Sequence, residues 1–212
     1  MTHSAVHLDE LERFPDMSGA PVLMPLRRTL GIQAFGVNCW TAPVGEPVIE
    51  RHAEPNGEEE LYVVLRGRAL FTVEGETVDA GIGTAVYVPP DTVREARAEE
   101  PDTVVLAVGG KPGEAFEQKS WEDFQIAFAQ ARAGGDDEAR VLVAETLERN
   151  PDAWQGWYNA AAFEALAGNA EGAFEHLGRA FELGPPEVRR LAAEGDDFTS
   201  LHSDPRWQEL VA

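Results

Sequence analysis

The chain has 212 residues, a formal net charge of -21 and a sequence pI of about 4.5. This acidic balance excludes nucleic acids and anionic membrane surfaces as expected partners, because both are bound through basic faces. The single cysteine, Cys39, excludes an internal disulfide and fits a reducing compartment. The start of the chain lacks the basic and apolar regions of a secretory signal, and no apolar run approaches the ~20 residues of a membrane helix. We therefore expect a soluble, cytoplasmic protein.

The first segment, residues 1–27, is expected to be an arm. Residues 8–13 can form one helical turn. Proline and glycine then recur at Pro15, Gly19, Pro21 and Pro25, which predicts an extended arm without regular structure. We expect this arm to run along the edge of a sheet.

Residues 28–110 have the pattern of an all-β domain. The segment 28–42 alternates as a strand with two rather apolar faces, which favours one face toward a barrel interior and the other toward a partner surface. Short strands separated by turns then follow at regular spacing. They are expected at residues 50–54, 60–65, 69–73, 76–78, 84–88, 93–98 and 103–108.

Two spacings within these strands resemble the paired signature of the cupin superfamily. Glu60 and Gly67 fit E-x6-G, and Gly83 and Pro89 fit G-x5-P. The resemblance implies a double-sheet jelly-roll barrel. For this chain it also implies a homodimer formed through the barrel strands. In the family's full motifs, three histidines and one glutamate hold a metal ion.

The positions that correspond to the metal ligands differ from that pattern. His52 stands for the first histidine, Glu54 takes the place of the second, and Arg94 takes the place of the last. Arginine stays protonated and has no lone pair to donate, so Arg94 is not a ligand. A divalent transition metal held by His52, Glu54 and Glu60 is the alternative to a barrel without any cofactor.

Arg94 has two further interpretations. Alternation places Glu60 and Tyr62 on the face that looks into the barrel, where an unpaired carboxylate is costly. Arg94 from the opposing sheet can neutralise Glu60, or it can receive a small anionic ligand instead. The candidate ligand-binding residues of the barrel interior are thus His52, Glu54, Glu60, Tyr62 and Arg94.

After a linker at residues 111–120, the periodicity changes from two to 3.6. Helices are expected at residues 121–133, 136–149, 152–167, 170–183 and 187–193, with a capping tail at 197–211. Gly134 and Gly168 recur 34 positions apart, as do Pro151 and Pro185. With Trp157 and Tyr158 this is similar to the tetratricopeptide repeat, built from antiparallel helix hairpins.

These patterns predict a multidomain all-β plus all-α protein, a cupin barrel followed by a tetratricopeptide-like domain at residues 121–212. The first functional hypothesis is non-enzymatic: the barrel binds a small ligand or dimerises, and the helical repeats present a surface to a protein partner. The alternative is a metal-dependent enzyme, an oxygenase or isomerase of a small polar substrate, with no catalytic residue assigned beyond Tyr62 as an acid.

Overall fold

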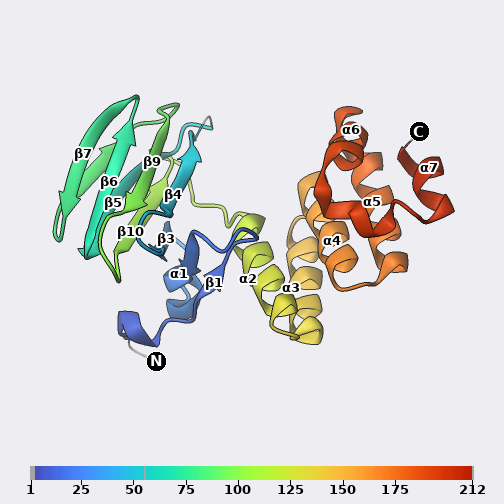
Figure 1. Cartoon of the computed structure of the whole chain (residues 1–212), viewed down its shortest axis with the longest axis horizontal. Coiled ribbons are helices and arrows are strands. Elements are labelled where there is room, and N and C mark those ends of the chain that lie inside the picture. Colours follow the sequence, from blue (N-terminus) through green and yellow to red (C-terminus); the bar gives the residue numbers. More distant parts are fainter. Residues whose placement is uncertain (1–2, 55, 212) are drawn as a thin grey trace. The chain divides into compact units, whose positions relative to one another are not determined.

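The protein is described by a computed structural model that covers residues 3–54 and 56–211. Met1, Thr2, Pro55 and Ala212, which the predicted arm, barrel and capping segment include, lie outside the described residues. The chain divides into two compact units, Met1–Lys119 and Ser120–Ala212. The first unit is built mainly from strands and the second from helices (Figure 1).

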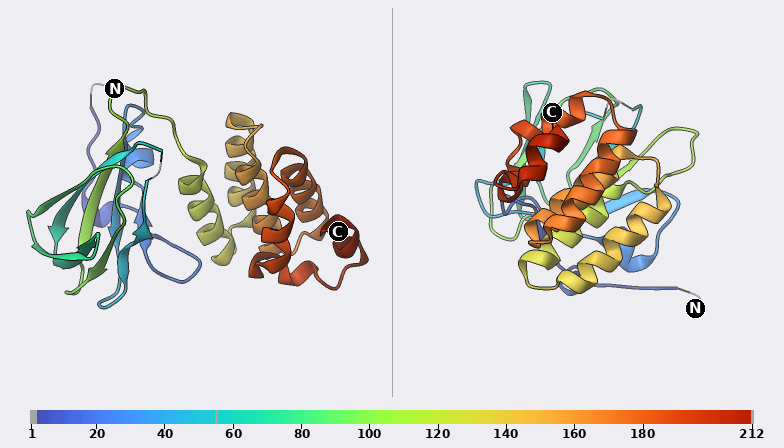
Figure 2. Two further views of the ribbon diagram at one scale, coloured as in Figure 1. Left: turned by 90° about the horizontal axis from the view of Figure 1, so that it is seen from above. Right: turned by 90° about the vertical axis from the view of Figure 1, so that its right-hand side faces the viewer.

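Two antiparallel sheets form the core of the first unit, as the jelly-roll prediction requires. One sheet has the strand order β1-β2-β3-β10-β5-β8 and the other β4-β9-β6-β7, and the sheets face each other as two layers (Figure 2). The strands are β1 (Phe14–Pro15), β2 (Val22–Met24), β3 (Gly36–Thr41), β4 (Pro47–His52), β5 (Glu59–Arg66), β6 (Arg68–Val73), β7 (Glu76–Gly81), β8 (Ala85–Val88), β9 (Arg94–Ala98) and β10 (Val104–Gly110).

Alternating side chains explain why these segments pair as strands. On β5, Tyr62 and Val64 are buried while Leu61 is exposed, which is the period of two expected when one face meets a core. Tyr62 packs with Phe71 of β6 across the two sheets, with 5.6 Å between ring centroids. The core of the unit therefore lies between the sheets.

The amino-terminal arm departs from the prediction in one respect. It runs along the sheet edge as expected, but β1 and β2 are regular strands, and β2 pairs with β3. The short helices η1 (Leu8–Glu10) and α1 (Leu26–Leu30) frame them. Edge strands tolerate proline because one side of the strand needs no partner, so the prolines of the arm permit short pairing that composition alone argued against.

The second face of β3 also has a different neighbour from the one predicted. Cys39 and Val104 pack with Leu11 and Met24 of the arm in one buried cluster. The chain's own arm thus covers the apolar face that was expected to meet a partner. Burial raises the pKa of the Cys39 thiol to about 11, which fits a packing role.

The second unit consists of helices, and the first five lie within two residues of the predicted bounds, while two short helices form within the predicted tail. The helices are α2 (Ser120–Arg132), α3 (Asp136–Arg149), α4 (Trp154–Leu166), α5 (Ala170–Leu183), α6 (Glu187–Glu194), η2 (Asp196–Leu201) and α7 (Pro205–Val211). Phe198 and Trp207 of the tail are buried against Tyr158 and Leu177, so the tail packs onto the helical core.

The 34-residue recurrence has a structural counterpart at the helix ends. Gly134 and Gly168 each follow a helix and take φ values of 85° and 74°, a left-handed conformation that glycine adopts without the penalty of a Cβ. The assignment of these helix pairs to tetratricopeptide-like repeats stays a prediction. Within the described residues, no helix combines the length and the apolar character needed to cross a membrane.

Candidate functional site

The predicted site residues meet at one end of the space between the sheets. His52 ends β4 and lies directly opposite Arg94 on β9. Glu60 and Tyr62 come from β5 of the facing sheet. Gly109 of β10 is the neighbour of Glu60 in the ladder, and a Cβ there would make ordinary van der Waals contact with Glu60 Cγ at 3.4 Å.

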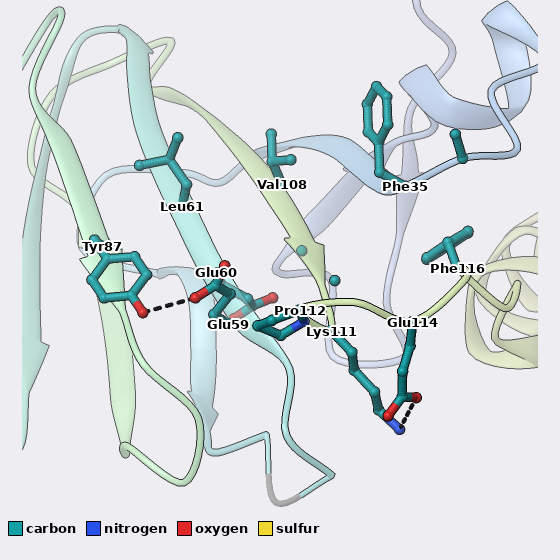
Figure 3. Close-up of a pocket in the computed structure, with 13 residues that line it drawn as sticks. Phe35, Glu59, Glu60, Leu61, Tyr87, Val108, Lys111, Pro112, Glu114 and Phe116 are labelled. Atoms are coloured by element: carbon teal, nitrogen blue, oxygen red, sulfur yellow. Dashed lines mark hydrogen bonds and ion pairs between the residues drawn. The ribbon is translucent and has the colours of Figure 1, made fainter.

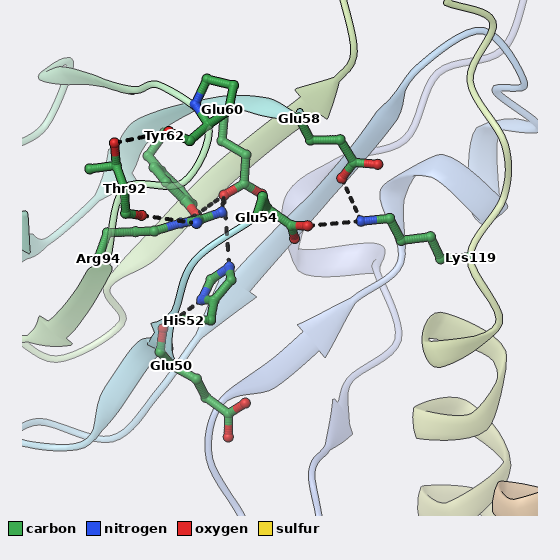
Figure 4. A network of polar contacts seen from close by, with 10 residues as sticks. Glu50, His52, Glu54, Glu58, Glu60, Tyr62, Thr92, Arg94 and Lys119 are labelled. Atoms are coloured by element: carbon green, nitrogen blue, oxygen red, sulfur yellow. Dashed lines mark hydrogen bonds and ion pairs between the residues drawn. The ribbon is translucent and has the colours of Figure 1, made fainter. Parts of the chain in front are cut away.

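Arg94 is the innermost member of the site, with only 1% of its side chain exposed. Its guanidinium donates to the Glu60 carboxylate, to Tyr62 Oη at 3.1 Å and to the Thr92 carbonyl at 3.3 Å. Tyr62 Oη in turn donates to Glu60 (Figure 4). The ion pair between opposing sheets that was one of the two interpretations of Arg94 is therefore present, and Tyr62 donates to the same carboxylate.

The environment keeps both buried partners in their usual protonation states. Burial, assisted by the Glu60 charge, raises the pKa of the Tyr62 phenol. Burial alone would lower the pKa of Arg94, but Tyr62 and Glu60 outweigh it and the net direction is upward. Tyr62 thus stays a hydrogen-bond donor and Arg94 a cation.

His52 lies nearer to solvent, at the mouth of the barrel. Its Nδ1 is 2.8 Å from the Glu50 carbonyl oxygen. Because a carbonyl only accepts, Nδ1 carries a proton, and a neutral His52 ring therefore has its lone pair on Nε2. Nε2 lies 3.8 Å from Glu60 Oε2, so the ring is turned toward the carboxylates.

Two residues that the sequence argument missed complete the mouth. Lys119, the last residue of the first unit, places its ammonium 3.2 Å from Glu54 Oε2 and in contact with Glu58 (Figure 4). Burial alone would lower the pKa of Lys119, but Glu58 and Glu54 outweigh it and raise the pKa overall. No periodic pattern connects residues more than 60 positions apart, so no signal in the sequence indicated that Lys119 contacts Glu54 and Glu58.

The metal that the cupin resemblance implies can be tested against these side chains. One donor atom from each of His52, Glu54 and Glu60 lies within 4.8 Å of the others. The donor types and spacing fit a three-ligand cation site, and the hydrogen bond from His52 Nδ1 to a carbonyl is a usual outer-shell contact. The charges do not fit: Arg94 and Lys119 already place two positive charges on the same group of carboxylates.

A second pocket, with a volume of about 320 Å³, lies beside the six-stranded sheet and has Glu60 among its lining residues (Figure 3). Phe35, Leu61 and Tyr87 line it and are exposed. Tyr87 Oη donates to Glu59 at 2.9 Å, and Lys111 pairs with Glu114 at 3.6 Å. The sequence argument did not identify this pocket, because its walls come from β5, β8, β10 and the segments that flank β3 and β10.

Comparison with known proteins shows which proteins the β unit is similar to. Residues 38–109 match the cupin domain family. This match agrees with the two-sheet architecture and with the motif spacings. It covers the strands from β3 to β10 that carry His52, Glu60, Tyr62 and Arg94.

Individual relatives of the cupin domain are distant. An uncharacterised protein of Streptomyces coelicolor is 29% identical over 109 residues, which cover 51% of this chain and 96% of that protein. A solved cupin protein from Bacteroides fragilis is 21% identical and covers 56% of this chain and 92% of its own, with a TM-score of 0.41. A sugar phosphate isomerase from Silicibacter pomeroyi is 20% identical, with coverages of 51% and 76% and a TM-score of 0.44.

Proposed function

We propose that the cupin domain is a metal-independent, non-enzymatic binding module for a small polar ligand. The observation that carries this proposal is the burial of Arg94 and its hydrogen bonds to Glu60, Tyr62 and Thr92. A guanidinium in this position serves as the internal counter-ion of Glu60. Removing a buried charge from its partner is costly, so the Arg94–Glu60 pair stays formed. We call this pair the floor of the barrel.

The groups above this floor define the chemistry of the ligand. The His52 Nε2 lone pair and the carboxylates of Glu54 and Glu60 are acceptors that converge at the mouth. Converging acceptors favour a ligand that presents donors, such as hydroxyl or ammonium groups. An anionic ligand stays a weaker proposal, because it would have to take Arg94 away from Glu60.

Elemental analysis of the full-length protein, purified without chelator, tests this function. We expect far less than one equivalent of manganese, iron, nickel or zinc per chain. A thermal-shift comparison of glucose with glucosamine, as hydroxyl and ammonium probes, should show stabilisation that His52→Ala abolishes. A near-stoichiometric metal that disappears in His52→Ala would contradict the proposal.

The second candidate is a metal-dependent enzyme, and the convergence of three donor atoms within 4.8 Å favours it. In that case His52, Glu54 and Glu60 would hold the ion, which would supply Lewis-acid polarisation of a small polar substrate. Tyr62 would keep its proton and orient Glu60 through the hydrogen bond seen here. The metal content of the purified protein separates the two candidates.

Partners of the two units complete the proposal. A homodimer through the cupin domain is supported by the exposed apolar residues Phe35, Leu61 and Tyr87 around the second pocket. A protein partner of the helical unit is supported by its likeness to repeat proteins, which bind through extended surfaces. Light scattering of the intact chain, alone and with candidate partners, measures both associations. Cytoplasmic localisation stays a prediction.

A further inference from the structure

Lys119 lies in the segment just before α2, and its ammonium contacts Glu54 and Glu58 at the mouth of the barrel. Its side chain is 33% exposed, while those of Glu54 and Glu58 are 19% and 16% exposed. Ion pairs at a fully solvated surface contribute little, but these carboxylates are largely shielded from water. The contact therefore has a defined geometry rather than being one of many interchangeable surface pairs.

Glu54 belongs to two arrangements at once. Its carboxylate contacts the Lys119 ammonium at 3.2 Å, and it is also one of the three donors that converge with His52 and Glu60. A divalent ion at those donors would need the Glu54 oxygens and would lie within a few ångströms of the ammonium. Like charges at such distances repel strongly where solvent is partly excluded.

We propose that Lys119 is a specificity-determining residue, whose ammonium occupies Glu54 and excludes divalent cations from His52, Glu54 and Glu60. This inference rests on the proposed metal-independent function and extends it, because it names the side chain responsible for the exclusion. Arg94 is buried and cannot leave Glu60 without exposing a charge to the core. Lys119 is the cation that can be removed from the edge of the site while the floor stays intact.

The experiment titrates the full-length protein with Mn²⁺ and follows free Mn²⁺ by electron paramagnetic resonance. Lys119→Met keeps most of the aliphatic stem and removes the charge. We expect this variant to bind one Mn²⁺ at least about tenfold more tightly than the unmodified chain, since one repulsive charge near the ion is lost. Lys119→Arg, which keeps the charge, should behave as the unmodified chain does.

Two matched variants locate the effect. Lys111→Met removes a lysine of the same segment whose partner is Glu114, and it should leave Mn²⁺ binding unchanged. Adding His52→Ala to Lys119→Met should abolish the gained affinity. Circular dichroism and thermal unfolding check that each variant folds, and Lys119→Gln replaces Lys119→Met if the methionine variant does not.

The outcomes separate this inference from the function on which it rests. Tight Mn²⁺ binding by the unmodified chain that depends on His52 overturns the metal-independent function and the inference together. Weak binding by both the unmodified chain and the lysine variants overturns the inference alone. A gain that survives His52→Ala, or that Lys111→Met reproduces, places the ion elsewhere and also overturns it.

Discussion

The two units each contain an arginine and a glutamate in close contact, but the buried partner is the arginine in one pair and the glutamate in the other. In the cupin domain the cation is buried, with Arg94 1% exposed, and Glu60 at 15% exposure extends toward the mouth. In the helical unit the carboxylate is buried, with Glu164 8% exposed, and Arg140 at 37% exposure reaches solvent. The first arrangement therefore leaves a partly exposed carboxylate at the mouth, whereas the second exposes a guanidinium that is already paired.

The additional partners of each pair support this distinction. Glu164 accepts from Arg140 and from Asn169 Nδ2 at 3.0 Å, and Asn169 Oδ1 caps α5 by accepting from the Gly172 amide at 3.2 Å. This network joins α3, α4 and the start of α5, which is a structural role. The Arg94 network instead lies beside His52, Glu54 and Glu60, the residues to which the proposed ligand would bind.

The largest expected effect comes from removing the buried cation. Arg94→Met leaves the Glu60 charge without its partner, and we expect a loss of about 3–5 kcal/mol in the free energy of unfolding. Urea denaturation of the full chain measures it. The double variant Arg94→Met/Glu60→Gln should recover part of this loss, because it removes the stranded charge as well.

A surface pair supplies the control for that measurement. Arg66→Met breaks a contact with Asp9, and it should give no measurable change because the pair is solvated. If Arg94→Met were as well tolerated as Arg66→Met, the guanidinium would not be the counter-ion of Glu60, and the distinction between the two units would fail.

An intermediate effect is expected in the helical unit. Glu164→Ala leaves Asn169 without one partner and removes the bond between α3 and α4, so we expect a loss of about 1–3 kcal/mol. Mn²⁺ and small-ligand binding to the cupin domain should not change in this variant. A change in ligand binding would show that the helical network is more than structural.

The smallest effect concerns pH. Burial lowers the pKa of His176, although Glu164 and Glu175 oppose the shift. At His176 the unfolded chain therefore binds a proton more readily than the folded chain. The contribution of neutral His176 to the free energy of unfolding is fully present above about pH 6.5 and is lost as the pH falls below that value. We expect the native chain to lose stability relative to His176→Gln as the pH falls from 7.5 to 5.5.

The same residue shows what local patterns leave out. The Nδ1 atom of His176 is buried and, among the described residues, has no hydrogen-bond partner. Its ring packs 5.5 Å from that of Trp157. Helical periodicity placed the residue between apolar positions but did not show that a tryptophan nineteen positions earlier would cover it.

The sequence by itself determined the features that depend on nearby residues. Period-two alternation around Tyr62 and Val64, the turns at Gly67 and Gly83, and the later period of 3.6 were enough to predict a β unit followed by helices. The place of Arg94 in the motif was enough to name its contact with Glu60 as one of two interpretations, because the spacing of a known barrel brings the two strands together.

The tertiary structure alone decided the features that depend on where distant segments meet. Lys119 reaches Glu54 and Glu58 from beyond the last strand, and the Glu50 carbonyl sets which nitrogen of His52 carries the proton. The arm covers Cys39 because β2 pairs with β3. Charge pairing and burial act through space, and the position of a residue along the chain records neither.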